Sequence, residues 1–188
     1  AYDFVMQAPS ARAINLMVGA GRARLTSTGL AVTGDYSSTT SGTSNLRLGV
    51  NAGNSIASGG DYNTVVGDEA GTAITTGGQN TALGYQSLSG GVASYYNTAI
   101  GYQALLSDTT GRESVAVGRN ALRTQNDTTS SSIYNTAVGA NAGYAVTTGT
   151  QNTLVGGLAG DAITTASYNT AVGYGSLTAN TTGADNTA

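Results

Sequence analysis

Residues Asn80–Tyr96 and Asn97–Glu113 read NTALGYQSLSGGVASYY and NTAIGYQALLSDTTGRE, and these two 17-residue segments decide the fold. Each begins with Asn-Thr-Ala, continues with one aliphatic residue and reaches Gly at its fifth position. Self-similarity at a fixed short period is the sequence signature of a repeat architecture. Positions 1 to 17 of the repeat are counted here from the Asn.

Further copies of the repeat extend in both directions from this pair. They start at Asn45, Asn63, Ser114, Asn135, Asn152 and Asn169, and the motif starts again at Asn186. Successive starts are 18, 17, 17, 17, 21, 17, 17 and 17 residues apart. The 21-residue spacing places a four-residue insertion within residues 124–133. We expect it to bulge outward and to leave the stack in register, because loops tolerate added length at small entropic cost.

The residue types within one copy predict a short strand followed by a turn. Position 4 is always aliphatic, and position 5 is Gly in all eight complete copies: Gly49, Gly67, Gly84, Gly101, Gly118, Gly139, Gly156 and Gly173. Gly adopts positive φ without steric cost, so it ends the strand in a turn. A second turn signal, Thr-Thr-Gly, recurs at residues 75–77, 109–111, 147–149 and 181–183. The pattern predicts an all-β, parallel β-solenoid or β-roll of 17-residue coils over residues 45–188, with eight complete coils and a truncated ninth.

The aliphatic residues at position 4 are predicted to fill the interior of the roll. They are Val66, Leu83, Ile100, Val117, Val138, Val155 and Val172. The small residues at positions 3 and 8, such as Ala99 and Ala104, are predicted to face neighbouring subunits, since only small side chains permit close backbone approach.

Each copy has a large aliphatic residue at position 9 or at position 12, and never at both. Where position 9 is Gly, position 12 is aliphatic, as in Gly71 and Ile74; where position 9 is Leu, position 12 is not, as in Leu88 and Gly91. All eight copies follow this rule. We infer one apolar plug of limited volume per coil, because supplying both residues would overpack the interior and supplying neither would leave a void.

Residues 1–44 form a different unit. Ile14, Leu16 and Val18 alternate with other residues, and RLTSTGLAVTGD (Arg24–Asp35) reads as a strand, a turn at Thr28-Gly29 and a second strand. We predict a β-hairpin or fibre-shaft module here.

Composition argues against an enzyme. The chain has no His and no Cys, so Ser–His and Cys–His nucleophiles are excluded, and no cofactor or metal motif is present. The adjacent acids Asp68 and Glu69 would point to opposite faces of a strand, which does not suit paired carboxylate chemistry. A pI of about 4.5 argues against nucleic acid as a partner. No apolar run is long enough to span a membrane.

Three further groups have structural interpretations. Arg112, Arg119 and Arg123 are expected to pair with nearby acids at the insertion rather than to bind an anionic glycan. The Asn column at position 1 predicts an amide ladder. Tyrosines at position 6 (Tyr85, Tyr102, Tyr174) and at the last position (Tyr62, Tyr96, Tyr134, Tyr168) predict stacking between coils, with a glycan-binding strip as the alternative.

Copies such as NTALGYQSL (Asn80–Leu88) and NTAVGYGSL (Asn169–Leu177) resemble the repeats of bacteriophage tail fibres. The variant ESVAVG (Glu113–Gly118) is similar to the repeats of YadA-like trimeric adhesin heads, which are parallel β-rolls. The resemblance implies a homotrimer in the tail fibre of a virion that supports host-receptor attachment. Further fibre or virion proteins, and a host surface glycan, are the partners it suggests. A bacterial surface adhesin head or extracellular filament is the alternative, and an ice-binding solenoid is a remote one. Because Ala1 is not Met and Asn186 begins an unfinished motif, we expect a fragment of a longer protein.

Overall fold

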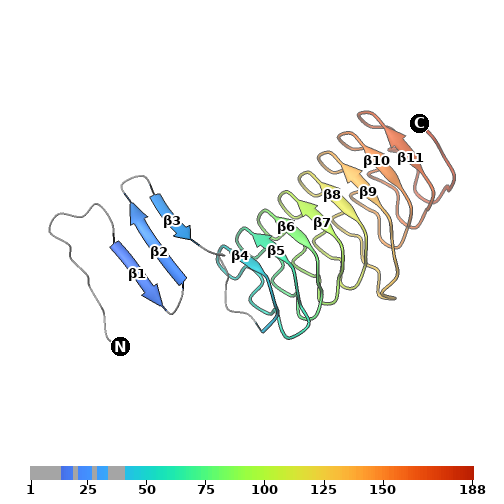
Figure 1. Ribbon diagram of the computed structural model, residues 1–188. Helices are drawn as coiled ribbons and strands as arrows, with labels where there is room; N and C mark the ends of the chain where they lie inside the picture. Colours follow the sequence, from blue (N-terminus) through green and yellow to red (C-terminus); the bar gives the residue numbers. More distant parts are fainter. Residues whose placement is uncertain (1–13, 19–20, 27–28, 34–40) are drawn as a thin grey trace. The chain divides into compact units, whose positions relative to one another are not determined.

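The computed structural model describes the backbone of residues 14–18, 21–26 and 29–33, and residues 41–188 in full. The chain divides into two compact units, Ala1–Ser37 and Ser38–Ala188, whereas the sequence pattern placed the boundary before Asn45 (Figure 1).

The first unit contains an antiparallel sheet in the order β1-β2-β3. Its strands are β1 (Ile14–Val18), β2 (Gly21–Thr26) and β3 (Gly29–Thr33). Leu16 is opposite Ala23, and Leu25 is opposite Leu30. The predicted turn at Thr28-Gly29 lies partly outside the described residues, and a fibre-shaft role for this unit stays a prediction.

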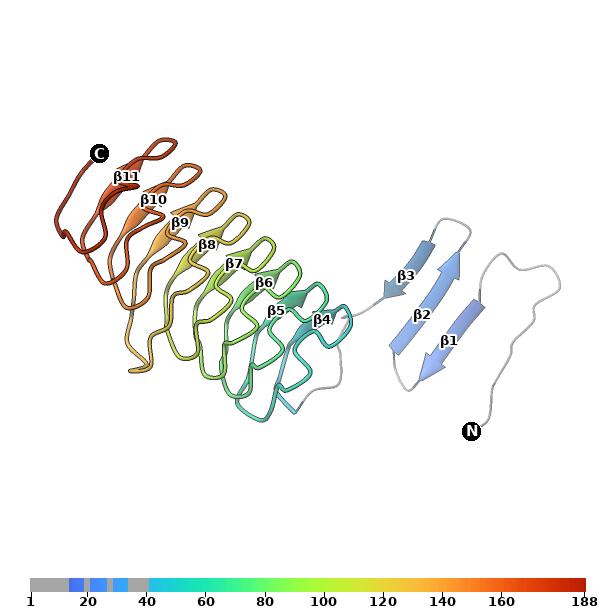
Figure 2. The same cartoon turned by 180° about the vertical axis from the view of Figure 1, so that it is seen from behind.

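The second unit is a parallel β-solenoid with turns of about 17 residues, as the repeat predicts (Figures 1 and 2). Each strand takes positions 2, 3 and 4 of one copy, and each pairs with the equivalent residues of its neighbours. The strands are β4 (Leu46–Leu48), β5 (Thr64–Val66), β6 (Thr81–Leu83), β7 (Thr98–Ile100), β8 (Val115–Val117), β9 (Thr136–Val138), β10 (Thr153–Val155) and β11 (Thr170–Val172).

The four-residue insertion leaves the sheet in register. Strand β8 pairs with β9 through Val115 and Thr136, as in every other pair of neighbouring strands. The loop is closed by Asp127, whose carboxylate accepts hydrogen bonds from Thr129 and Ser131, from both the backbone and the side chain of each. The prediction that the extra residues do not break the stack is confirmed.

The glycines at position 5 adopt a backbone conformation that a side chain would strain. Their φ angles lie between +128° and +140° in all eight copies. A Cβ at Gly84 would lie 2.7 Å from the carbonyl oxygen of Gly101, and one at Gly101 would lie 2.5 Å from that of Gly118. The glycines therefore stack backbone on backbone, which both their φ and their lack of a Cβ permit.

The assignment of position 4 to the interior is wrong. Its side chains point outward: Val66, Ile100, Val117 and Val155 are half-buried, while Leu83, Val138 and Val172 are 38–61% exposed. The interior side chains come instead from position 3, where Val65, Ala82, Ala99, Ala116, Ala137, Leu154 and Ala171 are fully buried. The residues at position 8 are buried as well, including Ala104 and Ala121, except for the half-buried Ser176. Ala99 and Ala104 therefore line the core of their own subunit and cannot face a neighbouring one.

The buried Asn at position 1 explains which face turns inward. Asn80 and Asn97 are 1% exposed, and alternate residues of a strand share a face. Position 3 must then point inward with position 1, and positions 2 and 4 must point outward. Asn occupies position 1 in seven of the eight complete copies, and its burial accompanies that of position 3, whereas the larger side chains at position 4 misled the prediction.

The plug inferred from positions 9 and 12 is present. Ile74 and Leu88 are fully buried, each from a different position of its coil. A Cβ at Gly71 would lie 2.7 Å from Cδ1 of Ile74, and one at Gly91 would lie 3.0 Å from Cγ of Leu88. Both positions therefore aim at the same volume, which holds one large side chain from position 9 or position 12. A coil with Gly at position 9 also has room for a larger residue at position 3, as Val65 and Leu154 show.

A ladder of asparagine amides runs through the interior. In the coil that starts at Asn80, Nδ2 donates to the carbonyl oxygen of Ser94 at 2.7 Å and closes the coil. The same Nδ2 donates to Oδ1 of Asn63, and the backbone N–H of Asn97 donates to Oδ1 of Asn80. The pattern repeats at Asn152 and Asn169. Each buried amide is therefore satisfied within and between coils, as the Asn column predicts.

Candidate functional site

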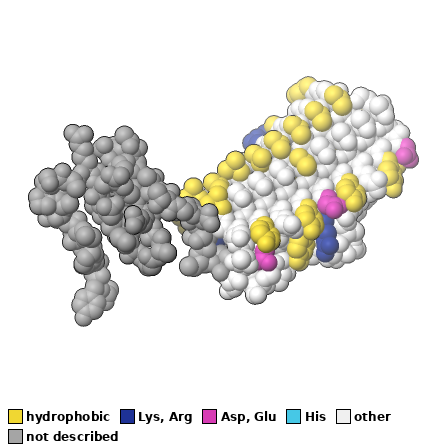
Figure 3. Space-filling view, viewed as in Figure 1, with side chains coloured by type: hydrophobic (Ala, Val, Ile, Leu, Met, Phe, Trp, Pro, Cys, Tyr) yellow, Lys and Arg dark blue, Asp and Glu magenta, His cyan; other side chains and the backbone are white. Residues whose placement is uncertain are grey.

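The outward face of the β4–β11 sheet is the surface that the repeat presents most regularly. Position 2 contributes a column of mostly Thr side chains, and position 4 contributes a column of aliphatic ones, here called the aliphatic row. The aliphatic row consists of Leu48, Val66, Leu83, Ile100, Val117, Val138, Val155 and Val172. Figure 3 shows hydrophobic side chains in a band along the stack, separated by other side chains from a second band.

The aliphatic row lies at the C-terminal ends of the strands, next to the turn at position 5. Position 6 adds apolar side chains to this side in several coils, with Val50 at 69%, Tyr85 at 41% and Tyr174 at 83% exposed. Tyr85 and Tyr102 stack with ring centroids 5.6 Å apart, which confirms stacking between coils for this pair. Eight coils at a strand spacing of about 4.8 Å make the row roughly 34 Å long. An apolar surface of this extent is typical of an interaction site.

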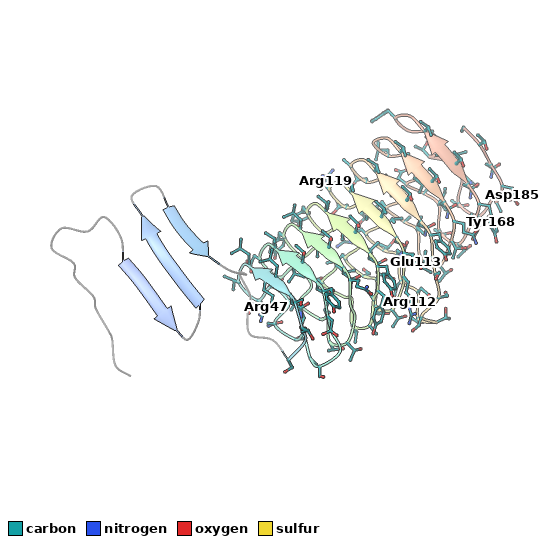
Figure 4. The ribbon with its side chains drawn as sticks, in the orientation of Figure 1. Arg47, Arg112, Glu113, Arg119, Tyr168 and Asp185 are labelled. Carbon is teal, nitrogen blue, oxygen red and sulfur yellow. The ribbon has the colours of Figure 1, made fainter. Side chains whose placement is uncertain are left out.

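The second band lies at the N-terminal ends of the strands, at the last position of each coil. Tyr62, Tyr96, Tyr134 and Tyr168 occupy it in alternate coils, and Gln79, Glu113 and Gln151 occupy it between them. Glu113, Tyr168 and Asp185 all lie along this side in Figure 4. Because the tyrosines are two coils apart, their rings cannot stack on one another, and the stacked ladder predicted for this position is wrong.

The three arginines near the insertion do not make the predicted ion pairs among the described contacts. The guanidinium of Arg112 lies over the ring of Tyr95, 4.9 Å from its centroid, and that of Arg123 lies 5.8 Å from the centroid of Tyr144. Nε of Arg123 also donates to Oε1 of Gln103 at 3.0 Å. Arg112 and Arg123 therefore lie against aromatic faces, and Arg123 also binds an amide.

Asp68 and Glu69 belong to the turn after β5. Oε2 of Glu69 accepts a hydrogen bond of 2.6 Å from Nε2 of Gln86, whose Oε1 accepts one of 2.8 Å from Gln103. The negative charge of Glu69 raises the pKa of Tyr85, and burial and the charge of Asp68 raise it further. Glu69 thus joins a chain of polar side chains across coils, and the two acids are not placed as a facing pair.

Two buried carboxylates, which sequence reasoning treated only as partners for arginine, lie near the insertion. Asp108 is fully buried at position 12, and its Oδ1 accepts a hydrogen bond from the backbone N–H of Asp127 at 3.3 Å. Burial raises the pKa of Asp108 to about 6. Burial also acts to raise the pKa of Asp127, but the hydrogen bonds from Thr129 and Ser131 outweigh it and lower that pKa to about 2.

Among the residues that the structure describes, no three acid, His or Cys side chains gather closely enough to hold a metal ion. The same residues include no helix that could cross a membrane. The residues at position 4, predicted to be interior, lie on the outward face, and the glycines at position 5 form the turns. Neither set adjoins a cluster of acid, His or Cys side chains among the described residues.

Comparisons of the chain with protein-family models, with curated proteins and with solved structures found no match.

Proposed function

We propose that the chain is a structural segment of a homotrimeric viral tail fibre, which holds a receptor-binding part at a distance from the virion. The observation that carries the proposal is the constant register of β4–β11, in which equivalent residues pair throughout. A stack of this kind grows by one coil for each 17 residues of sequence, which suits a spacer of fixed length. The resemblance of its repeats to tail-fibre repeats supports the viral assignment.

The aliphatic row is the surface we assign to subunit contact. The small residues at positions 3 and 8, which the sequence predicts to face neighbouring subunits, are buried within one subunit. They are therefore not available to a second one. The row is uncharged, and an identical row on a second copy would have the same spacing. Three such rows around a common axis would bury one another in heterologous contacts that close on themselves.

A bacterial surface adhesin head or filament would use the same stack and the same row. Ice binding is disfavoured by one feature of the outward face: β5, β6 and β7 read Thr-x-Val, Thr-x-Leu and Thr-x-Ile, so position 4 supplies no second Thr column. The genes surrounding the full-length reading frame would separate the viral assignment from the bacterial one.

Native mass spectrometry on the 188-residue chain tests the trimer. We expect a trimer for the unmodified chain and dissociation for Ile100→Glu, because a charge in the aliphatic row would be buried without a partner. Thr98→Glu is the matched control on the same strand and face, outside the row, and it should stay trimeric. A folded, monomeric unmodified chain would contradict the trimer. A trimer that Ile100→Glu leaves intact would place the contact elsewhere.

A further inference from the structure

The last position of each coil alternates strictly between tyrosine and a polar residue. From Ser44 to Asp185 the column reads Ser, Tyr, Gln, Tyr, Glu, Tyr, Gln, Tyr, Asp. The repeat itself has a period of one coil, so this column has twice the period of the fold. Nothing in the stacking of identical coils requires that doubling.

The backbone at this position is unfavourable for tyrosine. All nine residues have φ between +54° and +61°, a left-handed conformation in which Gly, Asn and Asp are favoured and bulky residues are rare. The conformation itself is needed, because the backbone N–H donates to the preceding coil, as from Tyr62 to Thr43 and from Tyr168 to Thr150. Any residue with an N–H supplies that bond, so it does not explain the tyrosine side chains.

The tyrosine rings contribute little to the core. Tyr62, Tyr96, Tyr134 and Tyr168 are 51–61% exposed. The described ring and side-chain contacts are few: Tyr96 lies 6.1 Å from the ring of Tyr95, and the hydroxyl of Tyr168 lies 3.4 Å from Nε2 of Gln151. A strained backbone carrying an exposed aromatic ring in every second coil points to a use outside folding.

The spacing and neighbours of these rings define a ligand chemistry. Two coils separate successive tyrosines by about 10 Å, and the register across the insertion keeps that spacing between Tyr96 and Tyr134. Between the rings lie the amides of Gln79 and Gln151, and beside them runs the column of Thr hydroxyls at position 2, of which Thr81 and Thr153 are exposed. Flat apolar faces at regular intervals with hydroxyl and amide groups between them match the alternating faces and hydroxyls of a sugar chain.

The charge of this column of last-position residues indicates which class of polymer it can bind. It carries Glu113 and Asp185 and no arginine, and the whole chain has a net charge of −3. Nucleic acids and anionic glycans would be repelled by this column. We infer that Tyr62, Tyr96, Tyr134 and Tyr168 form a binding strip for an extended, neutral polysaccharide whose disaccharide repeat spans two coils, so that every second sugar ring lies on a tyrosine. The strip lies at the N-terminal ends of the strands and the aliphatic row at their C-terminal ends, and the inference does not depend on the trimer.

Isothermal titration with β-1,4-linked oligosaccharides of glucose and of N-acetylglucosamine tests the strip. We expect the affinity for one of the two series to increase from tetramer to hexamer to octamer, because each added disaccharide reaches one more tyrosine. The α-1,6-linked glucan dextran lacks an extended disaccharide repeat and should not bind. Absence of binding by both β-1,4 series would overturn the inference.

The variant Tyr96→Asn/Tyr134→Asn separates binding from folding. Asn is favoured at this φ, so the thermal midpoint should stay the same or increase, while the affinity should decrease about tenfold or more. Tyr96→Phe/Tyr134→Phe keeps the rings and should retain binding. Tyr85→Ala/Tyr102→Ala removes the stacked pair at the C-terminal ends of the strands and should retain binding as well. Unchanged binding by the Asn variant, or a loss that accompanies a lower thermal midpoint, would contradict a binding strip.

Discussion

Oε1 of Gln125 accepts a hydrogen bond of 2.9 Å from Nδ2 of Asn135, at the one complete coil whose position 1 is not Asn. Ser114 stands there instead, and its hydroxyl oxygen accepts a hydrogen bond of 3.1 Å from Nε2 of Gln125. Gln125 is fully buried and comes from position 12 of the same coil. Its amide therefore replaces the missing asparagine and continues the ladder from Ser114 to Asn135.

Gln125→Ala should lower the free energy of unfolding by about 1–3 kcal/mol, because it leaves the hydroxyl of Ser114 and the amide of Asn135 without their buried partner. Chemical denaturation followed by circular dichroism measures the change. Adding Ser114→Asn to this variant should restore part of the loss, since Asn supplies the amide from position 1. The exposed Gln79→Ala is the control. Equal effects of Gln125→Ala and Gln79→Ala would show that the ladder does not need Gln125.

Gly101→Ala should destabilise the stack by roughly 2 kcal/mol or more, because its φ is +131° and a Cβ would lie 2.5 Å from the carbonyl oxygen of Gly118. Gly59→Ala is the matched control. Gly59 also has a positive φ, +94°, but no atom lies within 4 Å of the Cβ that would be added. We expect a clearly larger decrease of the thermal midpoint for Gly101→Ala. Similar decreases would mean that φ alone, and not the close approach of coils, requires Gly at position 5.

Gln103, two residues after Gly101, is not a suitable control for that experiment. It is half-buried and its amide bonds to Gln86 and Arg123.

Moving the plug of one coil from position 9 to position 12 should preserve the fold when both changes are made together. Leu88→Gly alone should lower the free energy of unfolding by about 2–5 kcal/mol through the cavity it leaves. Gly91→Ile alone should lower it by about 1–3 kcal/mol, because a Cβ there already lies 3.0 Å from Leu88.

The double variant Leu88→Gly/Gly91→Ile should be more stable than the sum of the two losses predicts. Gly also relieves the φ of +48° that Leu88 adopts. Unfolding free energies of the four chains form a double-mutant cycle. Additive losses would show that the two positions do not share one volume.

The buried Asp108 should make the chain less stable as the pH rises through about 6. Its pKa in the folded chain is raised to about 6 from 3.8, so the folded state binds a proton more tightly than the unfolded state. The stability that this proton contributes is complete below about pH 4 and is lost above pH 6. Asp108→Asn should therefore raise the free energy of unfolding by about 2–3 kcal/mol at pH 8 and change it little at pH 4. The same gain at both pH values would contradict a titrating Asp108.

Asp127 should affect the pH dependence of stability in the opposite direction to Asp108. Its pKa in the folded chain is lowered to about 2, so its contribution is present above about pH 4 and is lost as the pH falls toward 2. Asp127→Ala should accordingly destabilise the insertion loop at pH 7 and much less at pH 2. Hydrogen exchange of the amides of Thr129 and Ser131, which donate to Asp127, reports this loop locally.

The sequence by itself determined the period, the strand positions, the turn glycines and the neutral effect of the insertion. These follow from local chemistry: a strand of positions 2–4 ended by a Gly at φ near +130° is a property of five consecutive residues. The exclusion between positions 9 and 12 also appeared in the sequence, because two side chains of one coil compete for one volume and their identities therefore correlate. The Asn ladder was predictable since equal residues at equal positions stack.

Only the tertiary structure decided which face of the strand is inside. Both Ala99 and Ile100 are apolar, and alternation permits either to point inward. The choice depends on interior volume. Every coil with Leu at position 9, such as Leu105, has Ala at position 3, whereas the coil with Gly160 at position 9 buries Leu154 there. The replacement of an Asn by Gln125, and the burial of Asp108 beside the backbone of Asp127, likewise involve residues from separate positions or coils. Such contacts leave no periodic signal in the sequence, because each occurs once.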